Sequence, residues 1–133
     1  MHIQIVTPEK VLLDADADQI TIPTTTGDIT VLPHHVPLVS QLAPGELIIK
    51  KGGKEESIVV VGGFIQVTPS SVHVLADYAV SGKDISIVKA EEAKARAEKA
   101  MKERKSDVEF ALAESEFRRA ILELKVANRH RTH

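Results

Sequence analysis

Apolar side chains occupy alternate positions through most of the first 82 residues, in short β-branched runs that turn residues separate every eight to twelve positions. Alternation with a period of two is typical of strands that bury one face. Several short strands at this spacing predict a β-sandwich or barrel. The predicted strands lie at Ile3/Ile5, Val11/Leu13, Ile20/Ile22, Ile29/Val31, 47–49, 58–61, 64–67 and 72–75.

Two glycine pairs in this region predict different local structures. Residues 50–54, with Gly52 and Gly53 at their centre, predict a hairpin turn, because glycine adopts the positive φ that tight hairpins need. Gly62 and Gly63 lie inside an apolar stretch instead. There a glycine pair indicates either a β-bulge or a close approach of two backbones.

The composition changes sharply at Gly82. All six prolines and all seven glycines lie in the first 82 residues. From Lys83 onward the chain is rich in Ala, Glu, Lys and Arg, which favour helices. We therefore predict two domains, an all-β sandwich over residues 1–82 and an antiparallel two-helix hairpin over residues 83–133.

The two predicted helices span about residues 84–104 and 107–129. Asp84 can cap the first, and Ser106 with Glu109 fits a capping box that starts the second. A buried methyl group stabilises by about 0.8 kcal/mol, against roughly 1.5–3 kcal/mol for a buried Leu, Ile or Phe. The hairpin should therefore be weakly fastened, and should need the sandwich or a partner. Its apolar stripes are Ala90, Ala93, Ala97 and Ala100/Met101, then Phe110, Ala113, Phe117, Ala120/Ile121 and Leu124.

Composition excludes several classes of protein. Hydrophobic residues make up 43% of the 133 positions and charged residues 27%, as in ordinary globular domains. There is no cysteine, which excludes disulfides, thiol catalysis and thiolate zinc sites. No apolar run could span a bilayer and no signal peptide precedes the first strand. We expect a cytosolic protein that reaches a membrane only through a partner.

Charge is unevenly distributed along the chain. Residues 1–82 carry four Lys/Arg and nine Asp/Glu, a net charge of −5. Residues 83–133 carry thirteen Lys/Arg and ten Asp/Glu, a net charge of +3. Such asymmetry indicates either a basic surface for an anionic partner or a solvated helix surface, and the count alone favours the second.

No catalytic or metal-binding motif is visible. The six histidines form neither an HExxH motif nor a pair four residues apart, and His34 and His35 point to opposite faces of an extended segment. Structural or interface roles are therefore favoured over metal ligation. Alternating carboxylates at Asp14, Asp16 and Asp18 would share one strand face, where a charged sheet edge is favoured over a calcium site. We predict no catalytic residue, no metal and no cofactor.

Two segments resemble the epsilon subunit of F-type (rotary) ATP synthases. Residues 27–39 read GDITVLPHHVPLV, similar to that family's Gly-acid-Leu/Ile-x-Ile/Val-Leu-x-x-His-x-Pro-Leu segment. Residues 61–67 read VGGFIQV, similar to its Gly-Gly-Phe strand. The order of the motifs, the length and the break in composition agree with that family's sandwich followed by two helices.

The resemblance implies a non-catalytic central-stalk (rotor) subunit of a proton-translocating ATP synthase. In that family the sandwich clamps the gamma subunit onto the c-subunit ring. The helices permit ATP hydrolysis when folded against the sandwich and restrain it when extended into the alpha/beta catalytic head. The implied location is the cytoplasmic face of the bacterial plasma membrane, as a peripheral part of the complex.

The resemblance also assigns roles to residues by their place in the motifs. It implies c-ring contact at Gly27, Asp28 and Ile29, and it implies contact with gamma at His35, Pro37, Leu38, Gly62, Gly63 and Phe64. His34 stands where glycine is common in the family. Basic helix residues would meet an acidic segment of the beta subunits, although each is equally explained as a solvating residue. The chosen positions are Lys99, Lys102, Arg104, Lys105, Arg118, Arg119, Lys125 and Arg129.

Some bacterial members bind ATP between the helices through an Ile/Leu-Asp-x-x-Arg-Ala motif. The matching positions here are degenerate, since Ser86 follows Ile85 in place of the aspartate and Lys89 replaces the arginine. Val80 and Glu123 also depart from the pattern, whereas Arg96 and Arg119 match it. Each lost charge-assisted contact removes on the order of 1–3 kcal/mol. We predict no ATP binding at physiological concentrations.

The residues alone leave two further possibilities open. One is a free-standing β-sandwich binding module whose helical hairpin mediates oligomerisation. The other is an enzyme such as a metal hydrolase, which would need the scattered histidines to converge.

Overall fold

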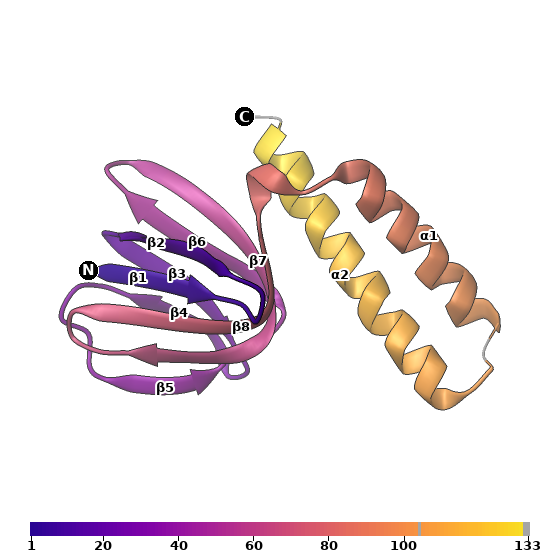
Figure 1. The fold of residues 1–133 in the computed structure, drawn as a ribbon, viewed down its shortest axis with the longest axis horizontal. Coiled ribbons are helices and arrows are strands. Elements are labelled where there is room, and N and C mark those ends of the chain that lie inside the picture. The colour runs from indigo at the N-terminus through magenta and orange to yellow at the C-terminus, as the bar shows by residue number, and fades with distance from the viewer. Residues whose placement is uncertain (104, 132–133) are drawn as a thin grey trace. The chain divides into compact units, whose positions relative to one another are not determined.

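The computed structural model describes residues 1–103 and 105–131, with the side chains of residues 130 and 131 excepted. They divide into two compact units, Met1–Ser81 and Gly82–His133, which are described separately. The elements are β1 (His2–Val6), β2 (Val11–Asp16), β3 (Gln19–Thr24), β4 (Gly27–Val31), β5 (Leu38–Gln41), β6 (Gly45–Lys51), β7 (Lys54–Val67), β8 (Ser71–Ser81), the 3₁₀ turn η1 (Gly82–Asp84), α1 (Ile87–Glu103) and α2 (Asp107–Arg131) (Figure 1).

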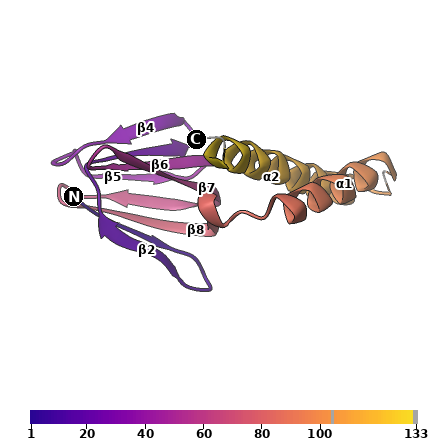
Figure 2. The same cartoon turned by 90° about the horizontal axis from the view of Figure 1, so that it is seen from above.

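The β unit is a sandwich whose two halves share β7 and β8 (Figures 1 and 2). Hydrogen bonds run in the strand order β2-β1-β8-β7-β6-β3-β4, and β5 pairs with β7 outside that order. β1 and β8 are parallel, and the other pairs are antiparallel. The first half of β7 pairs with β6 and the second half with β5. The predicted fold class, a β-sandwich followed by two helices, is confirmed.

The partner of β7 changes at Gly62–Gly63, between the Val60↔Gly45 and Phe64↔Gln41 pairs. Both glycines have positive φ, 71° and 117°. A Cβ atom on Gly63 would lie 2.0 Å from the Leu75 carbonyl oxygen. Of the two predicted structures the close backbone approach is therefore the one found, and the register with β8 continues across it.

Alternation places one buried layer inside the sandwich, as predicted. Ile3 and Ile5, Ile20 and Ile22, and Val72 and Val74 are fully buried, since successive strand residues point to opposite faces; Val31, Leu47, Ile58, Ile65 and Val67 complete the same core. Two expectations differ from the structure: residues 58–61 and 64–67 belong to the single strand β7, and β5 was not predicted.

The hairpin turn predicted over residues 50–54 is confirmed. Lys51 pairs with Lys54, and the two glycines between them have φ values of 57° and 80°. The Gly52 N–H donates to Asp18 Oδ2 at 2.8 Å. The expectation that Asp18 shares a strand face with Asp14 and Asp16 is therefore wrong, because β2 ends at Asp16 and the Asp18 carboxylate closes this turn instead.

The helical unit differs from expectation at the start of its first helix. α1 begins at Ile87, and the Lys89 N–H donates to Ser86 Oγ at 3.2 Å. Ser86 is thus the cap, and the prediction of Asp84 is wrong because Asp84 lies in the 3₁₀ turn η1. The cap of α2 is as predicted, since the Glu109 N–H donates to Ser106 Oγ at 3.1 Å. Among the described residues, neither helix has an apolar stretch of the length needed to cross a lipid bilayer.

α1 and α2 pack along a seam of small side chains. The buried side chains of the two helices are Ala90 and Ala97 on α1 and Ala113, Ala120, Leu124, Val126 and Ala127 on α2. Four other predicted positions, Ala93, Met101, Phe110 and Phe117, are only half-buried, and Ala100 and Ile121 are exposed. The apolar stripes are therefore confirmed, but the fully buried seam is narrower than predicted.

Candidate functional site

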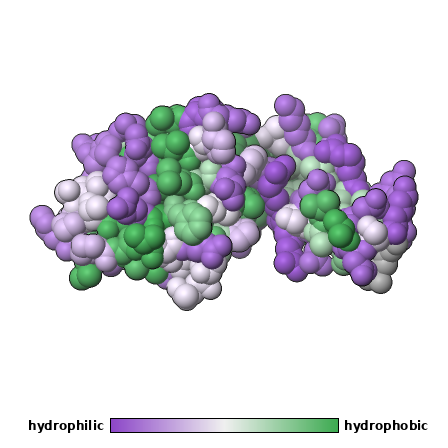
Figure 3. Space-filling model, turned by 60° about the horizontal axis from the view of Figure 1, so that its bottom comes forward, coloured by the Kyte–Doolittle hydropathy of each residue, from purple (hydrophilic) through white to green (hydrophobic). Residues whose placement is uncertain are grey.

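The outer surface of β5, β7 and β8 exposes large apolar side chains. Val39 is 70% exposed, Phe64 57% and Leu75 58%. Phe64 is the cross-strand partner of Leu75, and Val39 is the partner of Gln66. We call Val39, Phe64, Gln66, His73 and Leu75 the apolar face; with Ile65 they line a hollow of ≈ 450 Å³. Figure 3 shows hydrophobic side chains gathered on this side of the β unit. Grouped exposed apolar side chains mark partner-binding surfaces.

The apolar face follows from strand alternation. On β7, Ile65 points into the core, and on β8, Val72 and Val74 do the same. Because side chains alternate along a strand, their neighbours Phe64, Gln66, His73 and Leu75 point outward. Of the five residues of the apolar face, only Phe64 was predicted from the sequence as a contact residue. Leu75 could have been found as an apolar residue at an outward position, whereas Val39 depended on recognising β5.

The predicted c-ring residues lie where β3 turns into β4, the last strand of the hydrogen-bonded order. Gly27 has a φ of 116°, and its carbonyl accepts a hydrogen bond from the Thr24 hydroxyl. Asp28 is exposed and Ile29 packs partly against the core. The turn therefore presents the Asp28 carboxylate on a constrained backbone.

β5 joins this turn to the apolar face. The Thr25 N–H donates to the Gln41 carbonyl at 3.1 Å, and Gln41 is the register partner of Phe64. The next residue, Leu42, donates its N–H to the Gly63 carbonyl at 2.9 Å. The structure thus brings together two sets of predicted contact residues that are more than thirty positions apart in the sequence.

The loop between β4 and β5 contains the remaining predicted gamma contacts. His34 is the one non-glycine residue of the described chain with a positive φ, 67°, and its N–H donates to the Pro69 carbonyl at 2.9 Å. His35 Nδ1 lies 2.7 Å from the Val36 carbonyl oxygen. Pro37 is exposed and Leu38 is half-buried against the core. In this chain His35 and Leu38 therefore shape the loop.

All described members of the predicted basic set are exposed; Arg104 lies outside the described residues. Lys102 lines a hollow of ≈ 500 Å³ with Met101 and Phe117. Arg118 and Lys125 line another, of ≈ 410 Å³, beside the same two residues. The structure thus places three of the predicted cations around an apolar strip between the helices.

Two of the basic residues also form pairs within α2. Arg118 lies 3.1 Å from Glu114, and Arg119 lies 3.8 Å from Glu123. Glu98 and Lys102 line the same hollow. The remaining members, Lys99, Lys105 and Arg129, are exposed as well.

The degenerate nucleotide positions have other roles in the structure. Ile85 is buried at 3% exposure, and the Ser86 hydroxyl caps α1. Lys89 and Arg96 are exposed on α1, and Arg119 is paired with Glu123. The expected lack of ATP binding stays a prediction.

One histidine, His2 on β1, lies beside two carboxylates of the outer strand β2. His2 Nε2 lies 2.7 Å from Asp14 Oδ1, and His2 Nδ1 lies 3.7 Å from Asp16 Oδ1. Over the part of the chain that the structure describes, no group of three His, Asp or Glu side chains is arranged to hold a metal ion. Asp14 and Asp16 are exposed on β2, which is the first strand of the hydrogen-bonded order. Charged side chains on such an edge strand discourage pairing with the sheet of another molecule.

Both units correspond to known domains. Residues 1–82 match the beta-sandwich domain of the ATP synthase delta/epsilon chain, and residues 83–128 match its long alpha-helix domain. The chain belongs to the ATP synthase delta/epsilon chain family. Members of this family are subunits of the complex and are not themselves catalytic enzymes.

Bacterial relatives support this family over nearly the whole chain. The ATP synthase epsilon chain of Halalkalibacterium halodurans is 38% identical over 97% of this chain and 98% of its own length. The ATP synthase epsilon chain of Chloroflexus aggregans is 41% identical over 98% of this chain and 94% of its own length. The family therefore favours the ATP synthase hypothesis over the free-standing module and the hydrolase.

Solved structures extend the likeness to the fold. A chain of the Euglena gracilis mitochondrial ATP synthase OSCP/F1/c-ring structure matches with a TM-score of 0.76 at 26% identity, covering 98% of this chain and 80% of that one. A chain of the Tetrahymena thermophila central stalk/c-ring structure matches with a TM-score of 0.61 at 18% identity, covering 95% of both. The second likeness supports the fold alone.

Proposed function

We propose that this chain is a central-stalk subunit of a proton-translocating bacterial ATP synthase. The β unit binds the gamma subunit and couples it to the c-subunit ring, and the helical hairpin restrains ATP hydrolysis by the alpha/beta head. The complex holds the chain at the cytoplasmic face of the plasma membrane. The family membership supports the complex, and the apolar face is the observation that supports docking.

The apolar face suits a permanent protein partner. Its three large side chains lie on neighbouring strands that the sandwich holds rigidly, so docking would order few additional groups. Phe64 is the aromatic member, and aromatic residues dominate binding energy at interfaces. The nearby turn at Asp28 would then face a second partner, which we assign to the c-ring by the family resemblance.

The helical unit suits a reversible contact. Lys102, Arg118 and Lys125 surround an apolar strip, an arrangement that fits an acidic segment with apolar residues of its own. The buried seam between the helices consists mainly of alanine, so separating or rearranging them costs less than opening the sandwich. A weakly fastened element is what a conformational switch requires.

The first experiment is ATP hydrolysis by a reconstituted alpha-beta-gamma head, titrated with the full chain and with a truncation ending at Gly82. The β unit has its own hydrophobic core, so the truncation should fold. We expect both to bind and only the full chain to slow hydrolysis. If neither bound, the central-stalk assignment would be wrong; if both bound and neither inhibited, the helices would have another role.

A substitution at Phe64 tests whether the β unit docks through the apolar face. Phe64→Ser should weaken binding to the head at least tenfold, because a truncated aromatic anchor typically costs about 2 kcal/mol or more. Val11→Ser, an exposed residue of β2 away from the apolar face, is the matched control and should leave binding unchanged. Equal effects of the two substitutions would argue against docking on the apolar face.

Charge reversal tests the hairpin. Changing Lys99, Lys102, Arg118 and Lys125 to glutamate should relieve inhibition and leave binding through the β unit intact. The control is reversal of Lys50, Lys51 and Lys54, which lie at the turn between β6 and β7. Unaltered inhibition in the first variant would leave these helix residues with a solvating role only.

A further inference from the structure

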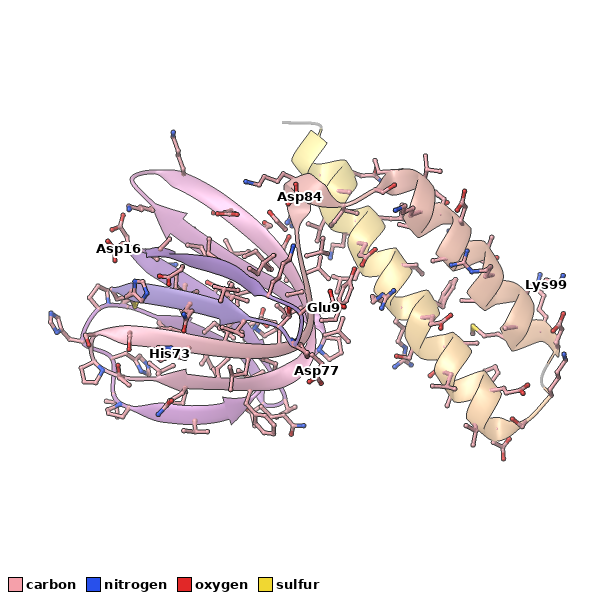
Figure 4. All side chains as sticks on the ribbon, in the orientation of Figure 1. Glu9, Asp16, His73, Asp77, Asp84 and Lys99 are labelled. Atoms are coloured by element: carbon pink, nitrogen blue, oxygen red, sulfur yellow. The ribbon has the colours of Figure 1, made fainter. Side chains whose placement is uncertain are left out.

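His73 lies among the outward-facing residues of the apolar face, near the start of β8, where Figure 4 labels it. Its register partners are Gln4 on β1 and Gln66 on β7. It is half-buried and lines the same hollow as Val39, Phe64 and Leu75. A partner that covers this hollow would therefore also cover the imidazole.

The imidazole has neutral neighbours. His73 Nε2 lies 3.4 Å from Ser71 Oγ, which lies 2.7 Å from Thr68 Oγ1. The outward residues of β7 beside it, from Phe64 to Thr68, include no ionisable side chain, and neither does any residue of β5. These neighbours can hydrogen-bond a neutral imidazole without balancing a positive charge.

The ionisable groups of this surface lie away from His73. His2 on β1 is the register partner of Ser71, and it pairs with Asp14 and Asp16 on β2. Asp14 is the register partner of Gln4, so it lies two strands from His73. On β8 itself Asp77 follows beyond Leu75, next to Gly62. The loop at the other end of β8 contributes His34 and His35, of which His34 bonds to Pro69. Among the described residues, none of these side chains forms an ion pair with His73.

We propose that His73 makes docking on the apolar face depend on pH, with the partner bound while the imidazole is neutral and weakened when it is protonated. The inference rests on the proposed function, in which this face binds another subunit. Covering an imidazolium with apolar surface removes its hydration and supplies no carboxylate in exchange. Protonation therefore favours the uncovered state.

The direction of the effect follows from linkage. A histidine side chain ordinarily has a pKa near 6.5. If a histidine must lose its proton to be covered, binding weakens as the pH falls below the value in the free protein. Binding should therefore be weaker at pH 5.5 than at pH 8.

The test is the dissociation constant of the full chain for an alpha-beta-gamma head lacking this subunit, measured at pH 8 and pH 5.5. The variants are His73→Gln, which keeps a polar side chain without the titration, and His2→Gln, which removes a histidine from the neighbouring strand β1. The readout is the ratio of the two constants for each protein. Circular dichroism at both pH values confirms that each variant is folded.

We expect the dissociation constant to be several-fold larger at pH 5.5 than at pH 8 for the wild type and for His2→Gln, and nearly unchanged for His73→Gln. An equal ratio in the wild type and His73→Gln, or tighter wild-type binding at pH 5.5, would overturn the inference and leave docking itself intact. Absence of binding at pH 8, or undiminished binding of Phe64→Ser, would instead count against the proposed docking surface.

Discussion

The β unit and the helical unit bury different kinds of side chain. The core of the sandwich consists largely of isoleucine, valine and leucine from every strand but β2 and β5, with Leu12, Leu13 and Leu38 packed against it. The seam between α1 and α2 is mostly alanine, joined by Leu124. Since buried area sets the hydrophobic contribution, the sandwich is a rigid platform and the hairpin is easier to rearrange. A docking surface needs the first property, and a regulatory element needs the second.

The largest effect should come from the sandwich core. Leu47→Ala removes a fully buried side chain of β6 and should lower the free energy of unfolding by about 3–4 kcal/mol, through lost burial and the cavity left behind. Leu112→Ala, at a 62% exposed position of α2, is the control and should change it by less than about 0.5 kcal/mol. Urea unfolding measures both, and similar losses would contradict the contrast between the units.

A backbone change in the sandwich should come next. Gly63→Ala places a Cβ against the Leu75 carbonyl and demands a left-handed conformation, so we expect a loss of about 3 kcal/mol. Gly53 also has a positive φ, 80°, but a Cβ there meets nothing within 4 Å, so Gly53→Ala should lose only about 1 kcal/mol. The thermal midpoints of the two variants test this order, and equal losses would show that positive φ alone limits both positions.

The helical unit should respond most to its caps. Ser106→Ala removes the hydroxyl that accepts the Glu109 N–H, and should destabilise α2 by about 1 kcal/mol. Ser115→Ala, at an exposed position within α2, should be neutral or slightly stabilising, since alanine is the better helix former. Amide hydrogen exchange in the first turn of α2 reports the difference, and unchanged protection in Ser106→Ala would show that packing alone fixes the start of the helix.

The smallest expected effect is an increase in stability, at His34. His34 holds a left-handed conformation, which costs an ordinary residue roughly 1–2 kcal/mol, while glycine adds flexibility to the unfolded chain. His34→Gly should therefore stabilise the β unit by up to about 1 kcal/mol. His35→Gly, whose backbone does not require glycine, should instead destabilise it by about 0.5–1 kcal/mol. Thermal unfolding of the pair decides whether the loop is strained at residue 34.

Much of this fold could be predicted from local patterns. Seven of the eight strands lie in or across predicted apolar runs, and Ser106 begins α2 as the capping box indicates. The misses have physical causes: β5 is only four residues long and carries Ser40 and Gln41, so its alternation is weak. α1 starts later than predicted, because aspartate and serine are both good caps and the sequence offers Asp84 and Ser86. In the structure Asp84 lies in the 3₁₀ turn η1, so Ser86 caps the helix.

The candidate site was harder to predict than the fold. Phe64 and the loop residues could be named from motif resemblance, but Val39 and His73 could not be placed beside Phe64, because β5 and β8 meet β7 only through pairing between strands. Likewise the basic residues could be counted in advance, but their placement around Met101 and Phe117 depends on how the two helices pack.

Local patterns were enough to predict the kind and order of seven strands and both helices, and the change from strands to helices after Gly82. Those properties follow from side-chain period, caps and turn residues, which act over a few neighbouring positions. Only the tertiary structure decided that β7 would exchange β6 for β5 at its glycine pair, and that His73 would stand beside an exposed apolar surface. Pairing between distant strands depends on the whole core closing at once, and no single segment encodes it.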